Sequence, residues 1–175
     1  EVSPEGSPRQ VDLFLPENPQ GAPVLFLWHG LGDTPSNIAR AFGAQQIAER
    51  FDTLVVVPHS SGRFLASEWS FLGSPQETDA YVFDESLACL HAQFDVDLNR
   101  VYTTGFSAGA LWSTWLLMHR SHHLAAVTLF SGGAGGINPY VTPQFKTPVL
   151  SFYGGEGDVF ANGLINFSEM TTALV

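Results

Sequence analysis

The sequence predicts an α/β protein with a mostly parallel sheet and helices on both of its faces. Short apolar runs, such as residues 23–28 and 53–57, alternate with segments of helical periodicity. These runs are apolar throughout rather than alternately apolar and polar, which is typical of strands buried on both faces of a parallel sheet. A length of 175 residues with a hydrophobic fraction of 45% can bury one sizeable core. We therefore expect residues 1–175 to form a single domain.

The order of the elements follows from the same patterns. Strands are expected over residues 11–15, 23–28, 53–57, 100–104, 125–130 and 148–153. Helices are expected over residues 36–50 and 78–94, from residue 108 onward and from residue 166 onward. Ser36 is the expected N-cap of the first helix, and Glu169 completes a possible capping box with Asn166.

The single cysteine, Cys89, lies on the helix expected over residues 78–94. The apolar side chains of this helix are spaced for one face and are Phe83, Leu87, Leu90 and Phe94. We expect Cys89 to be a small buried side chain on this helix. The alternative is a disulfide whose partner lies outside these 175 residues.

Charge and hydropathy exclude several classes of partner. The net charge is −10 at pH 7 and Lys146 is the single lysine, which argues against binding to nucleic acid and to anionic membrane surfaces. No apolar run reaches the ~20 residues that cross a bilayer. The chain begins at Glu1 without a charged-then-apolar leader, which is consistent with a removed leader or a trimmed sequence. Residues 95–106 begin like a calcium loop but lack its glycine and its final glutamate, so no metal site is expected.

A candidate nucleophile, Ser107, lies in the Gly-Phe-Ser-Ala-Gly motif at residues 105–109. A strand, a Gly-x-Ser-x-Gly motif and a helix in succession form a nucleophile elbow. Its glycines let the chain turn sharply, and its serine hydroxyl is exposed above the sheet. The helix N-terminus behind the serine supplies amide donors and a partial positive charge, which suit a developing oxyanion.

Other parts of a serine hydrolase site have candidates at the ends of strands. A His-Gly pair follows the strand over 23–28, and backbone amides after such a pair point at the substrate carbonyl. We assign the two oxyanion donors to the amides of Leu31 and Ala108. Asp158 follows the strand over 148–153, at the edge where ligands gather in open α/β sheets, and is the expected acid. Glu156 in the same turn is the alternative acid.

The general base has no obvious candidate. In this architecture the histidine follows the acid in the chain, but all six histidines precede Asp158. His29 belongs to the oxyanion strand end, and His91 lies on the helix of Cys89. The histidines at 119, 122 and 123 fall ~18 Å or more along the helix that follows Ser107, too far to take its proton. His59, after a strand end, is the one surrogate within reach.

These motifs resemble the α/β-hydrolase superfamily. The segments that carry the resemblance are His-Gly-Leu-Gly-Asp at 29–33, Arg-Val-Tyr at 100–102, Gly-Phe-Ser-Ala-Gly at 105–109 and Gly-Gly-Glu-Gly-Asp at 154–158. Within the superfamily, the chain is most similar to secreted esterases grouped with polyhydroxybutyrate depolymerases and with feruloyl or acetylxylan esterases. Its His-Gly-Leu-Gly-Asp segment is also similar to acyl-protein thioesterases.

The resemblance implies a secreted or periplasmic serine esterase that needs no cofactor. Such an enzyme hydrolyses a small-molecule or polymeric carboxylic ester through an acyl-serine. Members of this group continue past the acid with another strand, a histidine loop and a closing helix. The resemblance therefore implies a C-terminally incomplete domain, inactive alone, whose histidine comes from a further segment or from a second polypeptide. The alternative function, favoured by the absent histidine, is a non-catalytic binding or interaction protein with this fold.

Two pairs of aromatic residues receive different expectations. Trp69 and Phe71 lie in an irregular stretch near strand ends and are expected on the wall of the substrate cleft. Trp112 and Trp115 fall at helical spacing after Ser107 and are expected to be buried behind the elbow.

Overall fold

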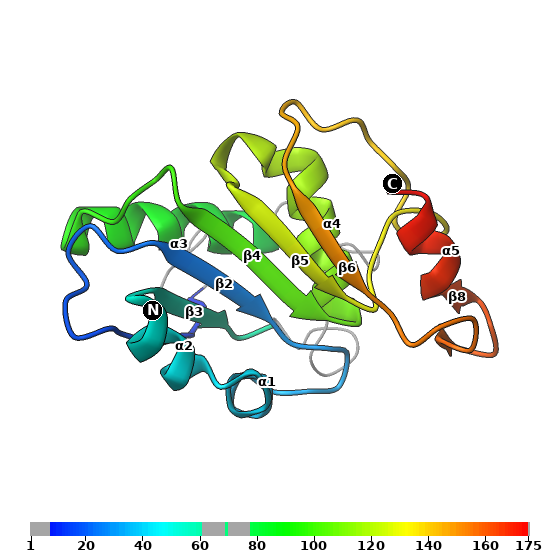
Figure 1. Cartoon of the computed structure of the whole chain (residues 1–175), viewed down its shortest axis with the longest axis horizontal. Coiled ribbons are helices and arrows are strands. Elements are labelled where there is room, and N and C mark those ends of the chain that lie inside the picture. Colours follow the sequence, from blue (N-terminus) through cyan, green and yellow to red (C-terminus); the bar gives the residue numbers. More distant parts are fainter. Residues whose placement is uncertain (1–7, 61–68, 70–77, 175) are drawn as a thin grey trace.

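The structure is a computed structural model and describes residues 8–60, Trp69 and residues 78–174. Its centre is a six-stranded sheet in the order β1-β3-β2-β4-β5-β6 (Figure 1). The strands are β1 (Val11–Phe14), β2 (Val24–Trp28), β3 (Leu54–Pro58), β4 (Val101–Phe106), β5 (Ala126–Phe130) and β6 (Val149–Phe152). Only β1 is antiparallel to its neighbour, and the other pairings are parallel. The expected mostly parallel sheet is confirmed.

Five α-helices and one short 3-10 helix accompany the sheet in the described residues. They are α1 (Pro35–Phe42), α2 (Ala44–Phe51), α3 (Thr78–Phe94), α4 (Ala108–Arg120), η3 (Ser121–His123) and α5 (Phe167–Thr172). A small antiparallel hairpin of β7 (Val159–Phe160) and β8 (Ile165–Asn166) precedes α5. The sequence patterns did not predict this hairpin. None of the described helices is long and apolar enough to span a membrane.

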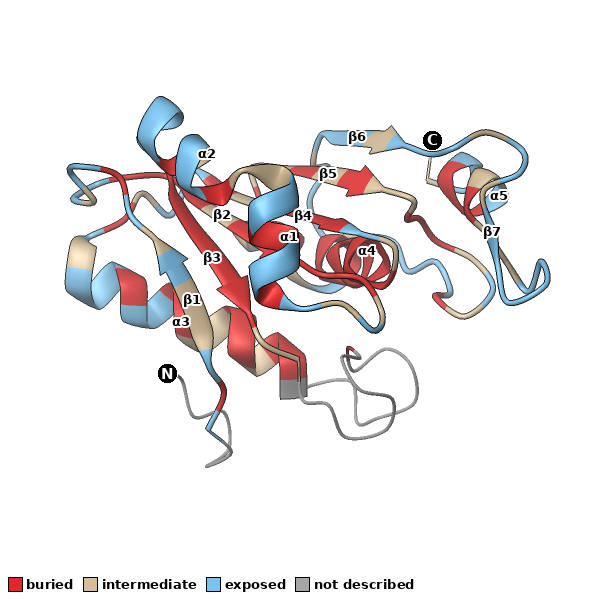
Figure 2. Ribbon diagram, turned by 90° about the horizontal axis from the view of Figure 1, so that it is seen from below, coloured by how far each residue is buried: buried red, intermediate tan, exposed pale blue. Residues whose placement is uncertain are grey.

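Each central strand contributes to two cores, one on each face of the sheet. Alternate residues of β2 and β3 belong to different clusters: Phe26 and Val56 pack with α3 and α4, whereas Leu27 and Val55 pack with α1 and α2. Figure 2 shows α1 and α2 on one side of the strands and α3 and α4 on the other. A strand buried on both faces must be apolar at every position, which explains the continuous apolar runs in the sequence.

The helix expected over residues 36–50 is in fact two helices. Gly43 ends α1 and begins α2 with a left-handed backbone (φ 69°, ψ 49°) that favours glycine. The N-cap is Thr34 rather than Ser36, because the Thr34 hydroxyl accepts a hydrogen bond from the amide of Asn37 at 3.2 Å. Pro35 then occupies the first turn, where its missing N–H costs no hydrogen bond.

Two expectations about helical side chains have opposite outcomes. Trp112 and Trp115 are buried behind the elbow, as expected, with their rings stacked at 4.8 Å. The expectation that Cys89 is buried is wrong. Its side chain is exposed and its Sγ is 3.0 Å from Nε2 of Gln93, because it lies off the face that buries Phe83 and Leu87.

The sheet changes character toward β6. Val149, Leu150 and Phe152 of this strand are all exposed, whereas every residue of β3 is buried. Within the described chain β6 pairs only with β5, so it is an edge of the sheet. Figure 2 shows the exposure rising from β3 across to β6.

Candidate active site

The nucleophile turn has the strained backbone that an elbow requires. Ser107 joins β4 to α4 with φ 53° and ψ −116°, a conformation that non-glycine residues rarely adopt. Its amide donates to the carbonyl oxygen of Phe130 at 2.9 Å, and its carbonyl accepts from the amide of Leu111 at 2.9 Å. These two hydrogen bonds hold the turn between the end of β5 and the first turn of α4.

The two glycines of the motif allow the turn to pack closely. An ideal Cβ on Gly105 would lie 2.4 Å from the carbonyl carbon of Gly109. Neither Gly105 nor Gly109 has a positive φ, so these positions need glycine for close packing rather than for its backbone freedom. The helix can then begin directly against the end of β4, with Ser107 half exposed at its N-terminus.

The expected oxyanion loop lies against this turn. An ideal Cβ on Gly30 would lie 3.6 Å from Cβ of Ser107 and 3.4 Å from the carbonyl oxygen of Phe106. The two expected donors belong to the segments that meet at this turn, since Leu31 follows Gly30 in the loop and Ala108 follows Ser107 at the start of α4. Neither donates a hydrogen bond to another residue of the described chain.

The expected acid is held by two donors from the neighbouring strand ends. Oδ2 of Asp158 accepts from the hydroxyl of Ser131 at 2.8 Å and from the amide of Gly154 at 2.8 Å. Within the described residues, its Oδ1 has no hydrogen-bond partner. Glu156, the alternative acid, is exposed and has no hydrogen bond within the same residues. The two donors fix the orientation of the Asp158 carboxylate. Its Oδ1 is available to accept a further hydrogen bond, which favours Asp158 over Glu156 as the acid.

The carboxylate and the serine turn are linked through the end of β5. Phe130 binds the amide of Ser107 through its carbonyl oxygen, and the next residue, Ser131, binds Asp158. Ser131 has a positive φ of 56°, so the chain turns at this point, and its hydroxyl is directed to Asp158. Because β4, β5 and β6 are parallel, Ser107 and Asp158 both lie at the carboxyl ends of the strands.

All six histidines lie in the described chain, and none of them binds Ser107 or Asp158. The Nε2 of His59 is 3.0 Å from Oδ1 of Asp12 on β1. Because β2 lies between β3 and β4, His59 is about two strand spacings, or ~10 Å, from the elbow strand and faces away from it.

Four other histidines lie toward the opposite, amino ends of the strands. His91 binds the carbonyl oxygen of Val96 shortly before β4 begins, and His119 stacks on Trp115 at 4.2 Å near the end of α4. The rings of His122 and His123 are 4.1 Å apart beyond that helix. The sixth, His29, is completely buried beside the oxyanion loop, and this burial lowers the pKa of its imidazole.

The two residues expected on the cleft wall have different outcomes. Phe71 lies outside the described residues. Trp69 is only 1% exposed, and its indole packs edge-on against Trp28 and against His29. Its Nε1 donates to the carbonyl oxygen of His29 at 2.8 Å, so Trp69 supports the oxyanion loop from the core rather than lining an open cleft.

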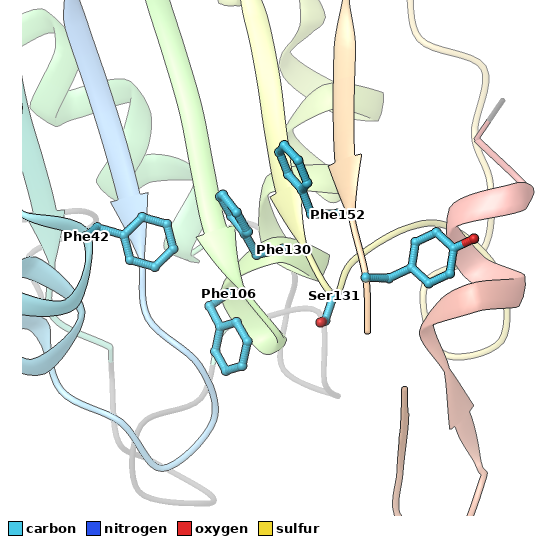
Figure 3. A pocket seen from close by; sticks show the side chains of 6 residues that line it. Phe42, Phe106, Phe130, Ser131 and Phe152 are labelled. Atoms are coloured by element: carbon cyan, nitrogen blue, oxygen red, sulfur yellow. The ribbon is translucent and has the colours of Figure 1, made fainter. Parts of the chain in front are cut away.

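An aromatic groove of about 300 Å³ opens beside this edge of the sheet. It lies on the face of the sheet that α1 covers (Figure 3). Its lining residues are Phe42 of α1, Phe106 of β4, Phe130 of β5, Phe152 of β6, and Ser131 and Tyr153, which follow β5 and β6. The Phe130 ring is 5.1 Å from both Phe42 and Phe152. Sequence patterns did not predict this groove, because its members run from residue 42 to residue 153 and meet only where α1 packs beside the paired strands β4, β5 and β6.

The described residues contain no group of three or more histidine, cysteine or carboxylate side chains that could hold a metal ion. What the site does assemble is a strained serine, two candidate oxyanion amides and an oriented carboxylate. Groups of these kinds occur together in sites that carry out acyl transfer through a covalent intermediate.

Comparisons with known proteins identify the family of this chain. Residues 4–154 match the model of the Esterase family, described as "Putative esterase". The chain belongs to the Esterase family and has the α/β-hydrolase fold. Feruloyl esterase D of Neurospora crassa is 28% identical over 153 residues, which cover 77% of this chain and 50% of that protein.

Solved structures resemble the fold at lower identity. The crystal structure of native sOPH superposes with a TM-score of 0.75 at 18% identity and covers 94% of this chain and 70% of its own. An S-formylglutathione hydrolase from Agrobacterium tumefaciens superposes with a TM-score of 0.64 at 17% identity and covers 77% and 56%. The chain spans half the length of feruloyl esterase D, the curated relative described above.

Proposed function

We propose that this chain carries the nucleophile, the oxyanion hole and the acid of a serine carboxylic ester hydrolase. In this mechanism Ser107 attacks the ester carbonyl, and the amides of Leu31 and Ala108 stabilise the tetrahedral oxyanion. The acyl-serine that results is then hydrolysed by water. The single observation that carries the proposal is the strained backbone of Ser107, with φ 53° at a strand-to-helix turn. Such strain persists where the surrounding structure requires it, and it clusters at reactive groups.

Asp158 supports the proposal as the group that orients the base. Its Oδ2 is occupied by Ser131 and Gly154, which leaves Oδ1 for the N–H of a histidine. A histidine between Asp158 and Ser107 would take the serine proton and return it to the leaving group. Because none of the six histidines of the chain binds Ser107 or Asp158, we propose that this histidine comes from outside residues 1–175. The comparisons lend no support to a second polypeptide as its source.

The aromatic groove offers a surface for the segment that carries this histidine. Phe106 is 46% exposed and Phe152 is 47% exposed, although both lie on a sheet face that α1 and α2 cover further along. Ser131 lines the groove and also binds Asp158. A segment packed there would bury these aromatic rings and could reach Oδ1 of the carboxylate from the same side.

Two measurements test the proposal. The protein to use is the chain extended by the residues encoded after residue 175, called the extended chain below. A fluorophosphonate should add one label to it by intact mass, and p-nitrophenyl butyrate should be hydrolysed. Ser107→Ala should abolish both the label and the hydrolysis. Ser36→Ala, which removes an exposed serine at the start of α1, should change neither.

The isolated chain tests the source of the base. Loss of the triad histidine lowers turnover by roughly a million-fold in subtilisin, so residues 1–175 alone should be nearly inactive. Equal turnover by the isolated and extended chains, abolished by His59→Ala, would identify His59 as the base instead. An extended chain that binds but does not hydrolyse any ester, with labelling that persists in Ser107→Ala, would favour a non-catalytic binding protein.

The substrate and the location are proposed more broadly. The net charge of −10 suits a neutral ester, whether a small molecule or a polymer. The relatives include a feruloyl esterase and a bifunctional acetylxylan esterase/xylanase, so feruloyl and acetyl esters belong in a substrate panel with hydroxybutyrate oligomers. We propose a secreted or periplasmic location, which fractionation of the producing cells would test.

A further inference from the structure

His29 lies where it can control the oxyanion loop without touching the substrate. Its side chain is completely buried, and its ring packs 4.7 Å from the indole of Trp69. The imidazole Nδ1 is 2.9 Å from the carbonyl oxygen of Gly30. A carbonyl oxygen only accepts hydrogen bonds, so Nδ1 must carry the proton and donate it.

This hydrogen bond sets the direction of the next amide. The carbonyl of Gly30 and the N–H of Leu31 belong to one peptide group, and in a trans peptide they point in opposite directions. The Gly30 carbonyl also accepts from the amide of Asp33 at 3.1 Å. Two donors on one side therefore hold the Leu31 N–H on the other side.

The preceding peptide is anchored in the same way. The carbonyl oxygen of His29 accepts from Nε1 of Trp69 at 2.8 Å. Two successive carbonyls of the loop are thus fixed by the ring nitrogens of buried side chains. The loop itself lies against the elbow, since an ideal Cβ on Gly30 would be 3.6 Å from Cβ of Ser107.

From these contacts, we infer that His29 is a positioning residue for the oxyanion hole: its Nδ1–H fixes the Gly30 carbonyl and thereby orients the Leu31 amide toward the acyl oxygen. The inference rests on the proposed ester hydrolase function. It differs from the role of a general base, because the Nε2 of His29 is buried without a hydrogen-bond partner and the residue makes no hydrogen bond to Ser107 or Asp158 among the described residues. Burial, which lowers the pKa of this imidazole, keeps it in the neutral form that holds one proton.

Two variants separate the effect of losing the Nδ1–H donor of His29 from the effect of changing the volume of its side chain. His29→Asn places an amide nitrogen at the δ position, where it can still donate to Gly30. His29→Leu fills a similar volume without a donor. In the extended chain, His29→Leu should lower kcat for p-nitrophenyl butyrate by about 10²–10³-fold with little change in KM, which is the cost of losing one oxyanion donor. His29→Asn should recover most of that loss.

A control removes the effect of lost stability. Thr103→Val also disrupts a buried hydrogen bond, that of Trp28 Nε1 to Thr103 Oγ1 at 2.9 Å, but it does not contact the loop carbonyls. Its kcat per fluorophosphonate-titrated site should match the wild type. In addition, ¹⁵N spectra at pH 7.5 should show His29 protonated at Nδ1 and not at Nε2.

The outcomes distinguish this inference from the proposed function. An extended chain without esterase activity would overturn the function and the inference together. An active enzyme in which His29→Leu keeps the wild-type kcat, or in which Nε2 carries the proton, would overturn the positioning role alone. Equal losses of kcat in His29→Asn and His29→Leu would also overturn it.

Discussion

The α-carbon of Gly109, at the start of α4, is pressed against the carbonyl group of Trp28, at the end of β2. An ideal Cβ on Gly109 would lie 2.1 Å from the Trp28 oxygen and 2.7 Å from the His29 oxygen. Both of these atoms are backbone, so neither can move aside without shifting the strand. This contact brings the helix of the nucleophile and the strand of the oxyanion loop to one place.

Gly109→Ala should therefore destabilise the fold as well as the site. Overpacking typically costs about 1–3 kcal/mol, and we expect this variant at or above the upper end because backbone must move. Urea unfolding followed by tryptophan fluorescence measures the change. Gly157→Ala is the matched control, since nothing lies within 4 Å of its added Cβ, and it should change the free energy of unfolding by less than about 0.5 kcal/mol.

Ser131→Ala should weaken the hold on Asp158. The hydroxyl of Ser131 donates to this carboxylate at 2.8 Å, and a hydrogen bond to a charged group contributes about 1.5–3 kcal/mol. In the extended chain we expect kcat for p-nitrophenyl butyrate to fall by about 10–100-fold. Glu156→Gln, on the alternative acid, should leave kcat unchanged. A larger loss in Glu156→Gln than in Ser131→Ala would assign the acid to Glu156.

Arg9 and Asp79 form a buried ion pair whose side chains are 8% and 1% exposed. Replacing Arg9 with methionine leaves the carboxylate of Asp79 buried without its guanidinium, which costs about 3–5 kcal/mol. Arg100→Gln breaks the exposed pair with Asp97 and should change the free energy of unfolding far less, because solvent screens that pair. Urea unfolding of the two variants checks the difference, and similar costs for both would contradict it.

Protonation of three partly or fully desolvated histidines should destabilise the protein in acid. Burial lowers the pKa of His29, His119 and His123 below their usual value of 6.5, so the folded state binds fewer protons than the unfolded state. Their contribution to stability is fully present above pH 6.5 and is lost as the pH falls through the folded pKa values. The free energy of unfolding should fall from pH 7.5 to pH 5.5. It should fall less in His29→Asn, and an equal fall in that variant would contradict the account for His29.

Much of the fold could be predicted from local patterns. The helix expected over residues 78–94 has those bounds in the structure, and Asn166 caps α5 through its Oδ1, which accepts from the amide of Glu169 at 3.3 Å. Both follow from spacing along a few turns of chain. The break at Gly43 was not predicted, because a single glycine is tolerated inside a helical pattern and its left-handed backbone depends on what α1 and α2 pack against.

In the candidate site too, features formed by neighbouring residues were predictable and features that join distant residues were not. The turn at Ser107 was predictable, since the strand, the two glycines and the helix adjoin one another in sequence. The supports of the other groups were not: Ser131 and Asp158 are 27 residues apart, and Trp69 binds a residue 40 positions before it. Trp69 was expected on the wall of an open cleft. Its indole is instead buried, because it packs against Trp28 beneath the loop.

The sequence by itself determined the class of fold, the succession of the six main strands along the chain and the position of the strained serine, because each depends on apolar periodicity or on residues adjacent in the chain. The tertiary structure alone decided which oxygen of Asp158 is held, how His29 and Trp69 anchor the oxyanion loop, and where Phe130 meets Phe42 and Phe152 in a groove. These features join residues on different strands, and the register of parallel strands brings them together only when the sheet forms.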